Sequence, residues 1–188
     1  MTDYQQVFAA IAADPRYLAN LDWGEARPGH PEGTIRAHIA ELERNLHALR
    51  PKVTDQEAWK LKVLIHTHDT FKPQARADVP IAHPQSHASL ARAFLAMHCD
   101  DPELLAIVQY HDEPFALYRQ QHHRGRYSAQ RFEALLNAIG DWDLFLAFAI
   151  IDGCTAGKSR EPMPWLFREL AGRIESRFSE ADIQPPAR

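Results

Sequence analysis

The stretch His66-Thr67-His68-Asp69-Thr70-Phe71-Lys72 contains a His-Asp pair on which the predicted fold and site of this chain depend. Just before it, Leu61, Leu64 and Ile65 recur at three- and four-residue steps, the pattern of an amphipathic helix. His68 stands four residues after Leu64 and three after Ile65. We therefore expect the side chain of His68 to face the core of a helical protein.

The same helical periodicity continues through most of the 188 residues, glycine is scarce, and alternating strand-like runs are absent. The predicted helices are Tyr4–Ala13, one that starts after Thr34 and ends at Pro51, others from about Asp55, Ser86 and Asp101-Pro102, and three near Ala129–Ile139, Trp142–Ile151 and Trp165–Phe178. Loops are expected over Lys72–Gln85 and Gln120–Tyr127, and a frayed tail over Gln184–Pro186. We predict an all-α fold, with residues 1–188 in a single domain.

Composition excludes several classes of protein. The 21 basic and 25 acidic residues give a net charge of −4, which offers no strong signal for nucleic-acid binding. No apolar run approaches the roughly 18–20 residues of a membrane span, and the N-terminus lacks the features of a signal peptide. Cys99 and Cys154 form no CxxC pair, so a reduced, cytoplasmic location is expected.

Five side chains of types that can bind a metal fall on the apolar faces of separate predicted helices. They are His38, His68, His87, His111 and Asp152. A lone histidine on such a face is more often a hydrogen-bonded core residue, whereas a buried carboxylate needs a charged or donating partner. Five together favour a shared cation, toward which Asp69 can also turn. Imidazole and carboxylate ligands without thiolate suit Fe, Mn, Co, Ni or Zn rather than Ca.

At this point a family resemblance becomes specific. His68-Asp69, with an inward His38 before it and an inward Asp152 after it, resembles the H…HD…D pattern of the HD-domain phosphohydrolases. The run from His30 to Thr34 resembles the His-Pro-Glu lead-in of some of these domains, and Asp152 to Lys158 is similar to their Asp-x-x-x-x-Arg segment. The resemblance covers about residues 28–165 and implies an HD-domain-like helical bundle with a central metal site.

Two departures from the family pattern affect the expected substrate pocket more than the metal. The segment His68-Asp69-Thr70-Phe71-Lys72 looks like the family's His-Asp-x-Gly-Lys, but Phe71 stands where the glycine is usual. Thr67 replaces a more apolar approach to the pair. The shape of the pocket is therefore open at this stage.

The number of metal ions also stays open. His87 and His111 resemble the two additional histidines of the binuclear H…HD…H…H…D subgroup, in which case Asp69 is the natural bridge between two ions. In mononuclear members, residues at these positions contact the substrate or support the ligands instead. Either one or two divalent ions fit the sequence.

The resemblance implies a metal-dependent phosphohydrolase that attacks a nucleotide or another small phosphoester with a metal-activated water. Asp69 and Lys72 are the expected catalytic residues. Lys72, Lys158 and Arg76 are expected to bind the substrate. The alternative for each of these cations is that it is an ordinary solvated side chain. Alternatives are a di-iron oxygenase acting on a polyol or phosphonate, and a nucleotide-sensing module without turnover. An oligomer is compatible with the sequence.

Other conspicuous residues are assigned no role. The run Gly153–Ser159 is one residue short of a phosphate-binding P-loop, and Pro162 and Pro164 argue against the helix that must follow such a loop. His66, two residues from His68, should point to the opposite side of its helix and lie at the surface. His83 and the His122-His123-Arg124 run are expected to be solvated.

Overall fold

The computed structural model describes residues 2–183, and within them it contains helices and no strand. The helices are α1 (Tyr4–Ala13), α2 (Pro15–Asn20), α3 (Ile35–Leu49), α4 (Asp55–Thr67), α5 (His87–Leu95), α6 (Pro102–Tyr110), α7 (Glu113–Arg124), α8 (Ala129–Ala138), α9 (Trp142–Gly153) and α10 (Pro162–Leu170). Short 3-10 turns lie at Arg50–Lys52, Lys72–Gln74 and Glu180–Asp182. The all-α prediction is confirmed. The expected frayed tail, Gln184–Pro186, lies outside the described residues.

The predicted helix starts coincide with capping side chains. Thr34 Oγ1 accepts a hydrogen bond from the backbone N–H of Ala37, and Thr54 forms a capping box with Glu57 at the start of α4. Asp101 caps α6, whose first residue is Pro102, a position that needs no N–H donor.

Two helices were missed in the sequence. The short α2 follows Asp14-Pro15, the same cap-and-proline signal as at α6, and Asp14 accepts from the N–H of Arg16. The loop predicted over Gln120–Tyr127 is wrong in its first half, because α7 continues to Arg124 and ends at Gly125, whose φ of +67° is the left-handed conformation of a helix C-terminus.

The last helix was placed too late. It was expected over Trp165–Phe178 but runs from Pro162 to Leu170. The argument that Pro162 and Pro164 forbid a helix is wrong, because both prolines lie in its first turn, where backbone N–H groups have no partner within the helix. The P-loop is still excluded, because Gly153–Ser159 follows a helix rather than a strand.

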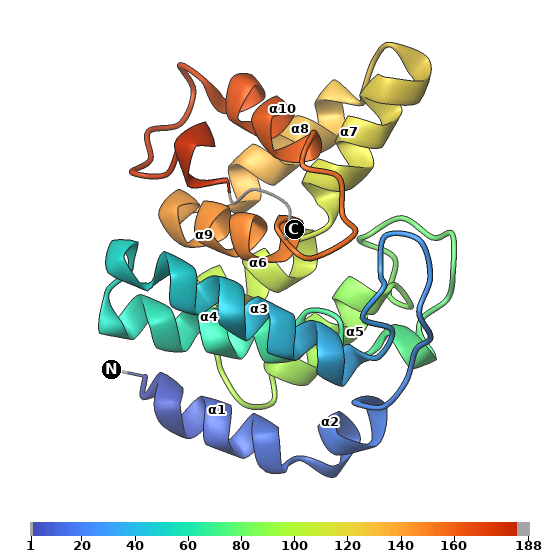
Figure 1. Ribbon diagram of the computed structural model, residues 1–188, viewed down its shortest axis with the longest axis vertical. Coiled ribbons are helices and arrows are strands. Elements are labelled where there is room, and N and C mark those ends of the chain that lie inside the picture. The colour runs from blue at the N-terminus through green and yellow to red at the C-terminus, as the bar shows by residue number, and fades with distance from the viewer. Residues whose placement is uncertain (1, 184–188) are drawn as a thin grey trace.

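The helices pack in a bundle around α9. Figure 1 shows α3 and α4 side by side, with α1 and α2 on one side of them and α7, α8 and α10 at the opposite end. α9 contacts α3, α4 and α10 and carries apolar residues around its whole circumference, as expected for a central helix. Its Phe145 and Phe148 are fully buried in a core that extends from Tyr4 to Phe178.

No single helix within residues 2–183 has the length and apolarity needed to cross a membrane. The pair α8 and α9 passes such a test together by length and composition, but the two helices are bent by 117° at the break between them.

This packing brings helix ends, more than helix centres, to one place. His68 and His111 cap the C-termini of α4 and α6, and Asp152 lies in the last turn of α9. His87 is the first residue of α5, and His38 lies in the first turns of α3. The unpaired backbone groups of helix termini are therefore available to orient these side chains.

Candidate metal centre

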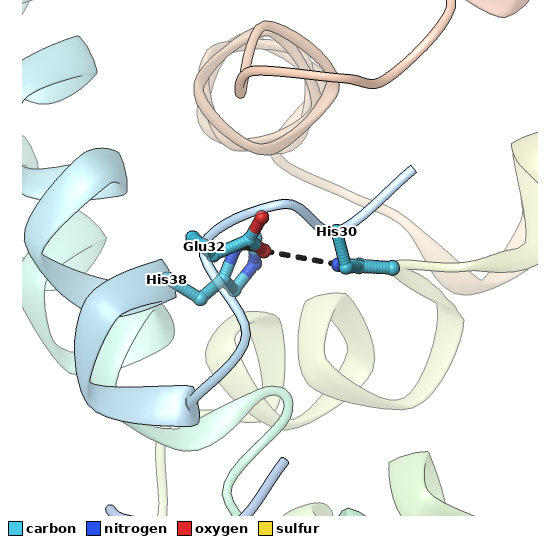
Figure 2. A group of neighbouring side chains, drawn as sticks. All are labelled: His30, Glu32 and His38. Carbon is cyan, nitrogen blue, oxygen red and sulfur yellow. Dashed lines mark hydrogen bonds and ion pairs between the residues drawn. The ribbon is translucent and has the colours of Figure 1, made fainter. Parts of the chain in front are cut away.

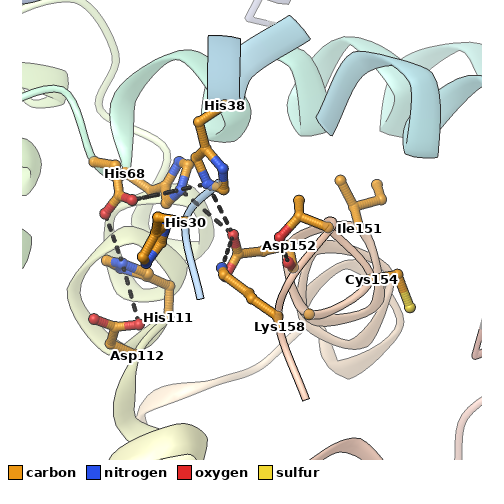
Figure 3. A network of polar contacts seen from close by, with 12 residues as sticks. His30, His38, His68, His111, Asp112, Ile151, Asp152, Cys154 and Lys158 are labelled. Atoms are coloured by element: carbon orange, nitrogen blue, oxygen red, sulfur yellow. Dashed lines mark hydrogen bonds and ion pairs between the residues drawn. The ribbon is translucent and has the colours of Figure 1, made fainter. Parts of the chain in front are cut away.

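The six side chains proposed as ligands in the sequence come together in two adjacent groups. We call His38, His68 and Asp152 the inner group, and Asp69, His87 and His111 the outer group. Within each group, one possible ligand atom per residue lies within 4.8 Å of the others. Figure 3 shows His38 and Asp152 reaching toward each other from α3 and α9, with His68 and His111 beside them.

In the inner group, His38 Nε2 lies 3.1 Å from Asp152 Oδ1. His68 Nε2 lies 3.9 Å from the same oxygen. The side chain of His68 is only 1% exposed. Three polar groups from three helices thus surround one point that water reaches poorly.

In the outer group, the Nε2 atoms of His87 and His111 lie 3.3 Å apart. Asp69 Oδ1 lies 3.6 Å from His111 Nε2 and 3.8 Å from His87 Nε2. The other oxygen of Asp69, Oδ2, faces the inner group, 3.5 Å from His68 Nε2 and 3.9 Å from His38 Nε2. Asp69 therefore stands between the two groups, with one oxygen toward each.

Helix ends fix the tautomers of two histidines. Nδ1 of His68 lies 3.2 Å and 3.1 Å from the carbonyl oxygens of Leu64 and Ile65, and Nδ1 of His111 lies 2.8 Å from the carbonyl oxygen of Val108. Because carbonyls only accept, each Nδ1 must donate a proton. The Nε2 lone pairs are left to point into the centre, the arrangement that metal-binding histidines adopt.

Buried polar atoms without hydrogen-bond partners also indicate a cation site. His68 Nε2 and Asp69 Oδ1 are buried and have no hydrogen-bond partner among the described residues. Buried polar atoms without partners are costly and rare, and a metal ion accepts the lone pairs of both. Imidazole nitrogens and carboxylate oxygens at these positions could hold a metal ion.

Two lysines balance the carboxylates. Lys72 Nζ is in contact with Asp69 Oδ2, and Lys158 Nζ lies 2.6 Å from Asp152 Oδ1. Burial alone would raise the pKa of each carboxyl group, but the neighbouring ammonium groups hold the pKa of Asp69 and of Asp152 well below the usual range. Both carboxylates are thus ionised and ready to bind a cation.

His38 has a carboxylate at each ring nitrogen. Its Nδ1 lies 3.0 Å from Glu32 Oε1, and its Nε2 faces Asp152. Burial would lower the pKa of His38, but the two carboxylates outweigh it and raise the pKa to about 9 when no cation is present. A proton on Nε2 therefore occupies the position that a metal ion would take.

Glu32 also contacts a second histidine. His30 Nδ1 lies 3.0 Å from Glu32 Oε1, and Figure 2 shows the carboxylate of Glu32 between His30 and His38. Although burial opposes it, hydrogen bonding to the two rings lowers the pKa of Glu32 to about 2. The sequence showed this pair only as part of a family-like lead-in, without a role. The geometry makes Glu32 the residue that orients His38.

Asp112 and Glu113 behave differently from one another. Asp112 Oδ2 lies 3.1 Å from His87 Nε2, the same nitrogen that faces Asp69, so Asp112 is a further possible ligand beside the outer group. Glu113 is 2% exposed and forms a bidentate ion pair with Arg131, at 2.6 and 2.5 Å. Glu113 is thus a structural anchor rather than a ligand.

Two cavities reach the centre. A small one of about 20 Å³ is lined by His30, Glu32, His38, Asp69 and Lys72, together with residues of the 23–35 segment, and has room for about one water molecule. A large one of about 1000 Å³ borders the outer group and includes His87, Asp112 and Lys72 in its lining. Trp23 and Lys72 line both cavities.

The cations proposed to hold substrate take different positions. Lys72 and Arg76 line the large cavity, whereas Lys158 lies at the inner group through its ion pair with Asp152. Arg160, which lies two residues beyond Lys158, donates to the backbone carbonyls of Gly153, Cys154, Thr155 and Lys158. Its guanidinium group thus ties down the loop that carries Lys158.

The remaining histidines lie outside the centre. The prediction that His66 is at the surface is wrong, because the ring is half-buried between Tyr17 and Glu43, at 2.6 Å and 3.1 Å. His83 is half-buried in its loop, where its Nδ1 accepts from the N–H of Gln85. His122 and His123 are exposed, in the last turn of α7 rather than in a loop.

Neither a scan against models of protein families nor searches of curated proteins and of solved structures finds a match to this chain. The family resemblance therefore rests on the motif residues themselves. What the site does is inferred below from its geometry.

Proposed function

We propose that this protein is a metal-dependent phosphohydrolase of the HD-domain type that binds two divalent transition-metal ions, Mn, Fe, Co, Ni or Zn. The inner group and the outer group would each hold one ion. When bound, such ions supply Lewis acidity, which activates water near neutral pH and polarises phosphoryl oxygens.

The observation that carries this proposal is the position of Asp69. Its Oδ2 faces His38 and His68, and its Oδ1 faces His87 and His111, at 3.5 to 3.9 Å. A carboxylate that presents one oxygen to each of two histidine pairs is suited to bridge two ions. Two buried atoms that lack a hydrogen-bond partner among the described residues, His68 Nε2 and Asp69 Oδ1, lie one in each group, so two ions would satisfy both.

Lys72 and Lys158 have a defined part in this proposal. Lys72 forms an ion pair with Asp69, and Lys158 forms one with Asp152. In the proposed centre both carboxylates would bind a metal ion instead. Release from these ion pairs would leave two ammonium groups at the edge of the centre. They would then hold the oxygens of a phosphate group and stabilise the charge that develops during transfer.

The cavities favour phosphoester hydrolysis, because they give both water and an organic substrate access to the centre. The small cavity could place one water molecule beside Asp69 and His38, and the large one gives an organic substrate access to the outer group. Trp23 and Phe115, which are 44% and 47% exposed, are the large aromatic side chains in its lining and could stack on a nucleobase. A nucleotide is therefore the favoured substrate.

The test is a screen of the purified protein against nucleotides and other small phosphoesters, after reconstitution with Mn²⁺, Co²⁺, Ni²⁺ or Zn²⁺. We expect release of orthophosphate that chelation abolishes and metal restores. The Asp69→Asn variant should be inactive, and His47→Ala, which removes an exposed histidine of α3, should retain activity. Binding of nucleotides without phosphate release would support a sensing module instead. Two irons with oxygen consumption would support an oxygenase.

A further inference from the structure

The large cavity is strongly basic although the chain as a whole carries a net charge of −4. Its lining contains Lys72 and four arginines against two acidic residues, Asp78 and Asp112. The arginines are Arg76, Arg119, Arg124 and Arg131. Grouped cations that line one cavity concentrate a positive potential there and attract anions.

Three of these arginines are available for a ligand. Lys72 pairs with Asp69, and Arg131 is held by the buried Glu113. By contrast, no carboxylate in residues 2–183 forms an ion pair with Arg76, Arg119 or Arg124. The free cations are thus separate from those that the metal centre and the fold already use.

The geometry of α7 places these cations away from the metal centre. The helix begins directly after Asp112, and the residues with which it lines the cavity, 115, 116, 119, 120, 123 and 124, form one face of it. At 1.5 Å per residue, Arg119 lies about 10 Å along the helix from Asp112. The guanidinium group of Arg119 reaches back to the ring of Phe115, about one turn nearer the centre. Arg124 lies twelve residues after Asp112, about 18 Å along the helix, so a phosphate that reacts at the metal centre cannot also reach Arg124 by itself.

Helix electrostatics explain only part of this pattern. Cations in the last turn of a helix are favoured by its dipole, which accounts for Arg124 without any ligand. It does not account for Arg119 in the middle of α7, whose guanidinium carbon lies 5.8 Å from the centre of the Phe115 ring. Nor does it account for Arg76, which reaches the same cavity from the loop after α4.

We propose that the cavity selects phosphoesters that carry a second anionic group, which Arg124 binds together with Arg119 and Arg76, apart from the reacting phosphate. This inference rests on the proposed function, because the reacting phosphate is placed at the metal centre. It adds a specificity site to it, and it defines the substrate class as small compounds with two separated phosphates or a phosphate and a carboxylate.

The experiment compares matched ligands that carry one or two phosphates. Binding of adenosine monophosphate and adenosine bisphosphate, and of a hexose monophosphate and a hexose bisphosphate, is measured by calorimetry on the metal-loaded protein. We expect the second phosphate to tighten binding about tenfold or more, because it would form charge-assisted hydrogen bonds with the arginines. In an Arg119→Gln/Arg124→Gln double variant this gain should disappear, while affinity for the monophosphates stays the same.

The control is Arg44→Gln, which removes an exposed cation of α3 that does not line the cavity. An equal loss in this control, or an unchanged gain in the double variant, would overturn the proposal. Measuring phosphate release from the same ligands by the wild-type protein separates the two claims. A gain in affinity from the second phosphate in a wild-type protein that hydrolyses no phosphoester would leave the anion site standing and remove the proposed hydrolysis.

Discussion

The inner and outer groups use the same ligand types but differ in how their histidines are supported. In the inner group, His38 is oriented by Glu32, whose side chain is 9% exposed. In the outer group, Asp112 contacts the inward-facing Nε2 of His87, and its side chain is 41% exposed and lines the large cavity. The inner position is therefore shielded from solvent, and the outer position is open to ligands. We expect the inner ion to bind more tightly and the outer ion to be the one that a substrate reaches.

The largest effect is expected from Asp69→Asn, because Asp69 faces both the inner and the outer group. Asparagine keeps the shape but loses the charge and one acceptor oxygen. Metal content should fall at both positions, and hydrolysis should fall by more than about 100-fold. This loss exceeds the one seen when a residue that only hydrogen-bonds to a metal ligand is removed. Elemental analysis and initial rates measure this. A variant that keeps both ions and its rate would remove Asp69 from the centre.

A smaller effect is expected from Glu32→Gln, which acts on the inner group alone. The amide can still contact His38, but it no longer fixes the ring as an ionised acceptor. Affinity for the tighter ion should fall by about 10- to 100-fold, the range seen when partners of metal-bound histidines are removed. Competition with a chromophoric chelator measures the affinity. Equal weakening of both ions would contradict a role confined to the inner side.

The smallest effect is expected from Asp112→Asn, the matching change on the outer side. Because this carboxylate is partly solvated, its contact with His87 contributes less than a buried one. We expect the weaker ion to lose less than about tenfold in affinity, below the range for a buried partner. The same chelator titration compares the two variants directly. A larger loss here than for Glu32→Gln would reverse the assignment of shielded and open sides.

The sequence predicted the helices that have clear signals and missed those that lack them. α4 combines a capping box with a buried stripe, so its start and its inward face could be predicted. α7 has little apolar pattern, since Leu117 and Pro114 are its buried apolar residues, and its polar second half was taken for a loop. Periodicity cannot reveal a helix that buries so few apolar residues.

The candidate site shows a similar division. Five of the six proposed ligands could be selected because each is a polar side chain on an apolar face, and Asp69 because it adjoins His68. The structure brings all six together. The orienting role of Glu32 could not be predicted, because Glu32 lies in an irregular segment without periodicity and meets His38 only through the turn before α3. The position of Arg119 and Arg124 in the lining of the large cavity could not be predicted, because a basic helix face is usually solvated and the sequence does not show the cavity beside it.

The most direct test of the central claim is the metal stoichiometry of the wild type, His38→Ala and His111→Ala, each saturated with Mn²⁺ or Co²⁺ and analysed for bound metal. The two-ion centre predicts two ions per chain in the wild type and one in each variant, with the tighter ion lost from His38→Ala and the weaker one from His111→Ala. One ion in the wild type, unchanged by His111→Ala, would contradict it and leave the outer group as a substrate-binding surface.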